Sequence, residues 1–309
     1  MVQLLKGLVR SIRPRQALKN LSLFAPLIFT GFLFDSEKFS ITLWCAFIFT
    51  ILTSSVYLLN DIIDLPHDRL HPYKKFRPIA SGEVPVPVAL FLALVGFLVS
   101  LSLAYAHNPF FFLVLLTYFS LQVVYMFILK NIPILDIISI AAGFILRVYA
   151  GAVAINVHMN VWFLLCVVSL ALFLAAGKRR AEMVSLSGIA GKTRTSLSFY
   201  SPDLLDAYLS MFANSAWLSY ALFTFFASPL GITNRLPFLT DLPLALAGIN
   251  KWMMATVPFV VYGVMRYMRI VYQSNKAEAP ERVLLSDKPL LLSVFIWGIL
   301  VILILYGVS

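Results

Sequence analysis

The sequence carries little charge for its length. Asp, Glu, Lys and Arg make up 12% of its 309 residues and hydrophobic residues make up 61%, whereas a soluble domain carries about 25% charged residues. This shortage excludes an ordinary soluble domain and predicts an integral membrane protein. Cysteine is scarce too: Cys45 and Cys166 lie in apolar stretches without a CxxC pattern. We therefore expect two small buried side chains and no disulfide framework.

Common catalytic motifs are also missing. The chain has no G-x-S-x-G, no P-loop and no G-x-G-x-x-G, so these signatures support no function here. The four histidines do not predict a zinc site, because His67 and His71 lack the intervening Glu of an H-E-x-x-H motif. No small-residue cleavage site follows an apolar core near the N-terminus, so we expect no signal peptide there.

Long apolar stretches, in contrast, recur along the whole chain. A helix needs about 20 residues to cross the hydrocarbon core of a membrane. Nine stretches come near that length: about 17–34, 39–60, 86–106, 109–129, 133–156, 160–177, 205–227, 250–272 and 289–308. They lack the alternating polarity of barrel strands, so we predict an all-α bundle of nine transmembrane helices in a single domain, 1–309. Apolar residues at helical spacing opposite Lys and Arg predict an interfacial helix within residues 1–16.

Positive charges are distributed unevenly between the predicted loops. With the N-terminus in the cytoplasm, all 24 Lys and Arg residues lie in inner segments except Lys38, Arg235, Lys251 and, inside a span, Arg147. This asymmetry orients membrane proteins, so we place the N-terminus and the longest polar segments in the cytoplasm, at a bacterial plasma membrane. Orientation and anionic lipid account for most of the net charge of +10. We therefore predict no nucleic-acid partner.

An acidic pattern ends the second predicted span. Asn60, Asp61, Asp64 and Asp68 read N-D-x-x-D-x-x-x-D, and these offsets return to one face of a helix. Carboxylates held together repel each other and need a cation, and Mg²⁺ binds through a few carboxylates plus substrate phosphates. We predict that these four residues bind Mg²⁺ and that the three aspartates are catalytic. The alternative is an acidic helix end exposed to solvent.

Basic residues lie on the same predicted membrane face. Arg binds phosphate oxygens with two parallel hydrogen bonds, whereas Lys acts as a point charge. The candidates for phosphate binding are Lys19, Lys75, Arg77, Lys178, Arg179 and Arg180. Taken alone, each cluster is better explained as a positive flank of a membrane span. Together with the acidic pattern, they predict a polyphosphate held by metal on one side and by cations on the other.

One charge is predicted to lie inside a span. Arg147 should face a polar cavity and find a partner there, and Asp136, three helical turns earlier, is on a similar face. Either a structural pair of these two residues or a substrate contact explains the charge. Further candidates for the lining of this cavity are Asn20, Tyr125, Lys130, Asp136, Arg147 and Glu182.

These motifs resemble the UbiA-type intramembrane prenyltransferase superfamily. The matching stretches are "RPRQALKN", "NDIIDLPHDRLHPYKKFRPIASG" and "LDIISIAAGFILRVYAGA". In that family a second Asp-rich motif follows the sixth helix, but here the place reads "GKRRAEM". This departure is similar to one branch, the decaprenyl-phosphate phosphoribosyltransferases. More anionic groups in one site call for fewer acids and more cations, so the replacement agrees with that branch.

The resemblance implies a reaction and its partners. Phosphoribosyl diphosphate would donate 5-phosphoribose to a polyprenyl phosphate, with Mg²⁺ as cofactor and pyrophosphate as leaving group, for arabinan precursor synthesis. Assembly as a homo-oligomer is left open. One alternative is a prenyltransferase that moves a prenyl group from its diphosphate to an aromatic acceptor. Another is a transporter of an anionic solute, which would more often show paired broken helices.

Overall fold

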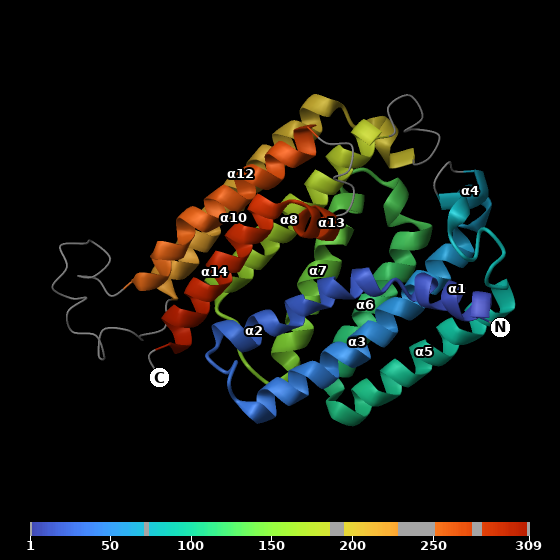
Figure 1. The fold of residues 1–309 in the computed structure, drawn as a ribbon, viewed down its shortest axis with the longest axis horizontal. Helices are drawn as coiled ribbons and strands as arrows, with labels where there is room; N and C mark the ends of the chain where they lie inside the picture. The colour runs from blue at the N-terminus through green and yellow to red at the C-terminus, as the bar shows by residue number, and fades with distance from the viewer. Residues whose placement is uncertain (1, 71–73, 186–194, 228–250, 274–279, 308–309) are drawn as a thin grey trace.

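The computed structural model describes residues 2–70, 74–185, 195–227, 251–273 and 280–307. Every regular element in these ranges is a helix (Figure 1), which confirms the predicted all-α class. The α-helices are α1 Val2–Ile12, α2 Phe24–Phe29, α3 Ser36–Ile63, α4 Leu65–Leu70, α5 Val86–His107, α6 Pro109–Phe127, α7 Leu135–Ala154, α8 Val161–Ser185, α10 Pro202–Phe226, α12 Val257–Gln273, α13 Pro280–Ser286 and α14 Lys288–Tyr306. The 3₁₀ helices are η1 Pro14–Leu23, η2 Lys74–Phe76, η3 Leu129–Asn131, η4 Thr195–Phe199 and η6 Trp252–Thr256.

The described part of the chain is that of an integral membrane protein. Six of its helices are long and apolar enough to cross a membrane: α3, α5, α6, α7, α8 and α14. α10 and α12 occupy the seventh and eighth predicted spans but are not among these six; α12 has only 17 residues. Large exposed side chains such as Phe91, Phe110 and Phe295 give α5, α6 and α14 surfaces suited to lipid.

The first predicted span is not one continuous α-helix. Residues Pro14–Leu23 form the 3₁₀ helix η1, and the short helix α2 follows it before Gly31 turns the chain with φ +85°. Proline disfavours the right-handed helical conformation in the residue before it and favours an extended one, but Arg13 is left-handed, with φ 54°. A 3₁₀ helix repeats every three residues, which brings Asn20 and Leu23 to the same buried face.

Two groups of helices share the core (Figure 1). α3, α5, α6 and α7 pack around one apolar cluster that includes Phe49 and Phe111. α8, α10, α12 and α14 pack around another that includes Phe173 and Tyr267. α7 and α8 contact each other and join the two groups. The polar side chains described below lie on helices of both groups, at and near this junction.

The N-terminal helix α1 has two apolar sides. Leu4 and Leu8 pack against the protein, in the cluster that contains Ile79 and Val84. Leu5 and Val9, on the other side, are 65% and 53% exposed. The exposed side agrees with the predicted interfacial helix, because an apolar strip beside Lys and Arg suits a membrane surface.

Gly151→Ala is expected to destabilise the contact between η1 and α7. A Cβ atom at Gly151 would lie 2.0 Å from the carbonyl oxygen of Leu23, so the backbones would have to separate. Overpacking of this kind costs about 1–3 kcal/mol, which thermal unfolding in detergent would measure. Gly298→Ala on α14 is the control, because its Cβ would meet nothing within 4 Å; equal behaviour of the two variants would contradict the account.

Candidate active site

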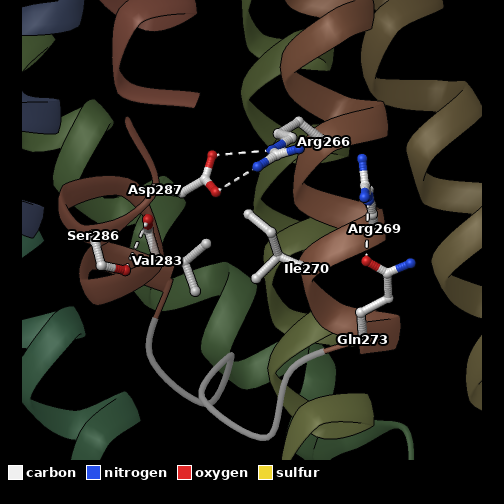
Figure 2. Close-up of a pocket in the computed structure, with 7 residues that line it drawn as sticks. All are labelled: Arg266, Arg269, Ile270, Gln273, Val283, Ser286 and Asp287. Carbon is white, nitrogen blue, oxygen red and sulfur yellow. Dashed lines mark hydrogen bonds and ion pairs between the residues drawn. The ribbon is translucent and has the colours of Figure 1, made fainter. Parts of the chain in front are cut away.

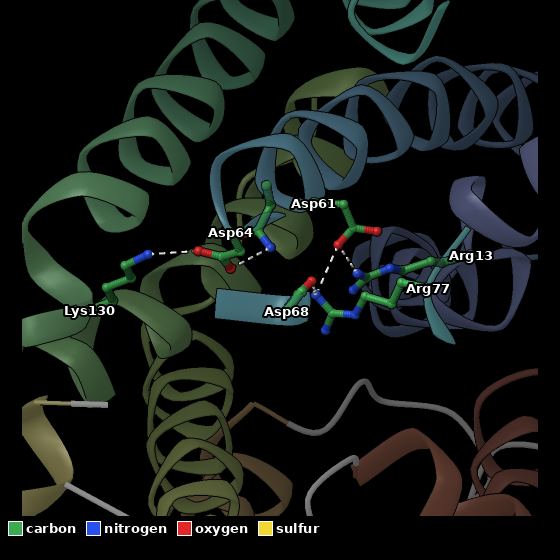
Figure 3. Close-up of polar contacts among 7 residues, drawn as sticks. Arg13, Asp61, Asp64, Asp68, Arg77 and Lys130 are labelled. Carbon is green, nitrogen blue, oxygen red and sulfur yellow. Dashed lines mark hydrogen bonds and ion pairs between the residues drawn. The ribbon is translucent and has the colours of Figure 1, made fainter. Parts of the chain in front are cut away.

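The acidic pattern lies where α3 ends and α4 begins (Figure 3). Asn60 and Asp61 belong to the last turn of α3, Asp64 caps that helix, and Asp68 lies on α4. Asp61 and Asp68 are 2% and 3% exposed. The pattern is therefore not a solvated helix end, and charges buried to this degree require partners.

Two arginines bind the buried aspartates. Arg13, just before η1, pairs with Asp61, and Nη1 of Arg77 lies 3.0 Å from Oδ1 of Asp61 and 2.6 Å from Oδ2 of Asp68. A single guanidinium nitrogen thus joins two carboxylates that come from different helices (Figure 3). Arg13 was not among the predicted site residues; the pattern R-P-R before a predicted span was the available signal.

Asp64 points to another cation. Nζ of Lys130, on η3, lies 2.9 Å from Oδ1 of Asp64, and the amide of Asn60 donates to Oδ2 at 3.1 Å. Lys130, one of the residues predicted to line the cavity, thus contacts the acidic cluster. Lys75 does not contact these acids in the structure: it is exposed, and its ammonium lies 5.2 Å from the ring centroid of Phe76.

The donors at this cluster suit a divalent ion. Among the described residues no three acidic, His or Cys side chains converge as a ready metal site. Asp61 and Asp68 nevertheless converge on one cationic nitrogen, that of Arg77. Carboxylate oxygens are the ligands that Mg²⁺ prefers. The residues therefore fit the ion, provided that it takes the place that Arg77 now occupies.

The second basic cluster is built around Arg179. Its side chain has no exposed surface, and its Nε lies 2.7 Å from Oδ2 of Asp136, which is equally buried. Arg179 also pairs with Glu182, one turn further along α8, and donates from Nη2 to the hydroxyl of Tyr125 at 2.9 Å. Two carboxylates already balance this guanidinium, so we assign it to holding α7 and α8 together instead of to a phosphate.

Asp136 is fixed from its other side by the segment after α8. The hydroxyl of Tyr200 donates to Oδ1 of Asp136 at 2.7 Å, and Ser196 donates to Oδ2 at 3.2 Å. Burial raises the pKa of Tyr200, so the phenol keeps its proton for this bond. The same hydroxyl accepts from the backbone N–H of Ile134 at 2.6 Å, where φ is 70°. Such a φ is strained for a β-branched residue, and the bond stabilises it.

The two basic residues next to Arg179 in the sequence have different surroundings. Arg180 binds Asp206 on α10, with Nε 2.5 Å from Oδ1. Asp206 lies near the start of α10 and neutralises this cation. Lys178 is half-buried and lies within electrostatic reach of Lys19 on η1. Lys19 and Lys178 thus bring positive charge from two elements to one place.

The structure corrects the predicted pairing of Arg147 with Asp136. Both residues are buried on α7, but eleven residues separate them, which is about 16 Å along a helix axis. Sharing a helix face is therefore not enough for contact. Asp136 pairs with Arg179, and Nε of Arg147 donates to Oδ1 of Asn20 at 3.0 Å.

Two pockets of the structure lie away from the acidic cluster. A pocket of about 250 Å³ lies between α12 and the segment from α13 to the start of α14 (Figure 2), lined by Arg266, Arg269, Ile270, Gln273, Val283, Ser286 and Asp287. Arg266 holds Asp287 with two bonds of 3.0 and 2.9 Å, which lowers the pKa of Asp287. A second pocket, of about 210 Å³, is apolar and lies between α2 and α14. Neither pocket includes the acidic cluster.

Comparison with known proteins agrees with this arrangement. The sequence profile of the UbiA prenyltransferase family matches residues 23–299. A decaprenyl-phosphate phosphoribosyltransferase from Corynebacterium glutamicum is 33% identical over 305 residues, which cover 97% of this chain and 87% of the relative. One from Mycolicibacterium smegmatis is 33% identical over 299 residues, covering 95% and 91%.

A solved structure shares the fold. A UbiA homologue from Archaeoglobus fulgidus, bound to GPP and Mg²⁺, superposes with a TM-score of 0.64 at 18% identity. The match covers 97% of this chain and 96% of the homologue. The predicted UbiA-like architecture is therefore confirmed, and the chain belongs to the UbiA prenyltransferase family.

Proposed function

We propose that this protein is a phosphoribosyltransferase that moves 5-phosphoribose from phosphoribosyl diphosphate to the phosphate of a polyprenyl lipid such as decaprenyl phosphate. The observation that carries the proposal is the 33% identity, over about 95% of the chain, to relatives named decaprenyl-phosphate phosphoribosyltransferase. The reaction releases pyrophosphate, and its product suits arabinan precursor synthesis. The site faces the cytoplasm of a bacterial plasma membrane, where the charged donor is soluble.

The basic residues near the end of α8 support this proposal over a transfer of prenyl groups. Two substrates that both carry phosphate bring more negative charge than a prenyl diphosphate and a neutral acceptor. The segment that is acidic in the family pattern here supplies Lys178, Arg179 and Arg180. Repulsion between acids and phosphates is thereby reduced. Continuous helicity of α7 between Gly143 and Gly151 gives no support to a transporter built on broken helices.

The residues of the acidic cluster have distinct roles in the proposal. Asn60, Asp61, Asp64 and Asp68 would hold Mg²⁺, which polarises the diphosphate and stabilises the leaving pyrophosphate. Arg77 and Arg13, displaced from the aspartates, are then available to bind diphosphate oxygens. Lys130 remains close enough to do the same.

The remaining cations position the other anions. Lys19, Lys178 and Lys75 are the candidates for binding a substrate phosphate, whereas Arg180 is already paired with Asp206. Arg179 links α8 to α7 through Asp136, and its bond to Glu182 lies within α8. The acceptor phosphate is already an anion at neutral pH, so the chain needs to align it with the anomeric carbon but not to deprotonate it.

Label transfer tests this proposal. Membranes that contain the protein are incubated with ribose-labelled phosphoribosyl diphosphate, decaprenyl phosphate and Mg²⁺, and the lipid fraction is counted. We expect label in the lipid fraction only when all three are present. A parallel incubation with labelled prenyl diphosphate and an aromatic acid is the control; prenylated product there, with no labelled ribosyl lipid, would contradict the proposal in favour of the aromatic prenyltransferase.

A further inference from the structure

Arg147 is a buried cation surrounded by neutral groups. It is 7% exposed, in the middle of α7. Its Nε donates to Oδ1 of Asn20 at 3.0 Å, its Nη1 to the carbonyl of Gly143 at 2.6 Å and its Nη2 to the hydroxyl of Tyr118 at 2.7 Å. The rings of Tyr118 and Phe49 lie 4.8 and 5.8 Å from its guanidinium carbon. No carboxylate of the described residues pairs with it.

The other buried arginine, Arg179, has the carboxylate partners that Arg147 lacks among the described residues. Arg179, with no exposed surface, is balanced by Asp136 and Glu182. A charge removed from water is costly unless an opposite charge accompanies it, and an ionisable residue inside a membrane helix is usually there for function. A guanidinium has five N–H donors, and three bonds leave Arg147 with donors for a further acceptor. Its surroundings are therefore incomplete without an anion.

A polar stripe on α3 connects Arg147 with the acidic cluster. Thr50, Thr53, Tyr57 and Asp61 are three or four residues apart and so lie on one helix face. The amide of Asn20, which also accepts from Arg147, donates to the hydroxyls of Thr50 and Thr53 at 2.9 and 3.3 Å.

Two of the four stripe residues keep accessible surface, whereas Thr53 and Asp61 are buried. Thr50 and Tyr57 are half-buried, and the guanidinium carbon of Arg13 lies 5.2 Å from the ring centroid of Tyr57. From Asp61 to Thr50 the stripe extends about 16 Å along the helix. A ligand anchored by the acidic cluster thus has a polar route toward Arg147.

We propose that Arg147 is the centre of a second anion subsite, which binds the phosphate monoester of a substrate at the inner end of this stripe. Phosphate supplies the negative charge that the chain itself lacks there, and the remaining N–H donors bind its oxygens. This inference rests on the proposed function in one respect: the proposed function identifies which substrates could supply the phosphate. The donor's 5-phosphate and the phosphate of the lipid acceptor have the same chemistry.

The test compares the purified protein with its Arg147→Gln variant in detergent. Thermal unfolding is measured alone and with ribose 5-phosphate or geranyl phosphate. The ligand-free midpoint should stay the same or rise, because an unbalanced buried charge is removed. Affinity for one of the two phosphates should fall about tenfold or more, since a charge-assisted bond is lost; the affected ligand identifies the source. Arg179→Gln is the matched control and should lower the midpoint.

A second variant keeps Arg147 and supplies the missing charge. Asn20→Asp places a carboxylate on the existing partner of Nε. The variant should stabilise the ligand-free protein. It should also lower the affinity for the same phosphate about tenfold, because the new carboxylate competes with that phosphate for Arg147. Unchanged phosphate affinity in both variants, or in Asn20→Asp alone if Arg147→Gln does not fold, would overturn the subsite. If the protein transfers no label but still binds phosphate in a way that depends on Arg147, the proposed function is contradicted and the subsite is supported.

Discussion

Arg179→Gln is expected to lower the free energy of unfolding by about 3–5 kcal/mol, the usual cost of removing one partner of a buried ion pair. Asp136, with no exposed surface, would lose the guanidinium that balances it. Tyr200 and Ser196 would still donate hydrogen bonds to it, but hydroxyl groups do not replace a counter-charge. Denaturation of the purified protein in mixed micelles measures the loss.

The double variant Arg179→Gln with Asp136→Asn separates charge from packing. Replacing both partners by neutral groups of similar shape removes the unbalanced carboxylate, so most of the lost stability should return. If the double variant is as unstable as the single one, or if Arg179→Gln keeps its stability and loses only phosphate binding, the assignment of Arg179 to structure is wrong.

Asp61→Asn is expected to reduce label transfer about 100- to 1000-fold, the range observed when a charge-stabilising group is removed from an active site. Stability should change far less. The side chains of its partners Arg13 and Arg77 are 24% and 25% exposed, so both cations can turn to water, and Arg77 keeps Asp68. The two measurements are initial rates of label transfer and thermal midpoints on the same preparation.

Glu83→Gln is the matched control for Asp61→Asn. Glu83 pairs with Arg10, and both side chains are well exposed, at 38% and 56%. Exposed ion pairs contribute about 0–1 kcal/mol, so neither rate nor midpoint should change much. A rate for Asp61→Asn close to that of Glu83→Gln, at limiting Mg²⁺, would exclude the metal role of Asp61.

The sequence predicted the all-α architecture and the approach of Asp61 to Asp68, but not the break of the first span into η1 and α2. Apolar length predicted the helices, because a membrane leaves few other ways to satisfy the backbone. Helical offsets predicted that Asp61 and Asp68 would come together, and they bind one nitrogen of Arg77. The break at Asp64 between α3 and α4 did not prevent this.

The partners of each charge required the three-dimensional structure. Lys178, Arg179 and Arg180 are adjacent in the sequence, but successive residues on a helix point about 100° apart. Arg179 consequently points into the core, whereas Arg180 reaches Asp206 on α10. Similarly, Arg147 and Asp136 lie on the same face of α7 but are three turns apart along its axis. Periodicity gives the face of a residue but not what packs against that face.

Release of pyrophosphate by the purified protein tests the central claim most directly. Phosphoribosyl diphosphate, decaprenyl phosphate and Mg²⁺ are supplied together and then each is omitted in turn, with wild-type protein and with Asp61→Asn. The account predicts release only from the complete mixture with wild-type protein, in equal amount to the ribosyl lipid formed. Release without the lipid phosphate, or at the same rate from Asp61→Asn, would contradict it.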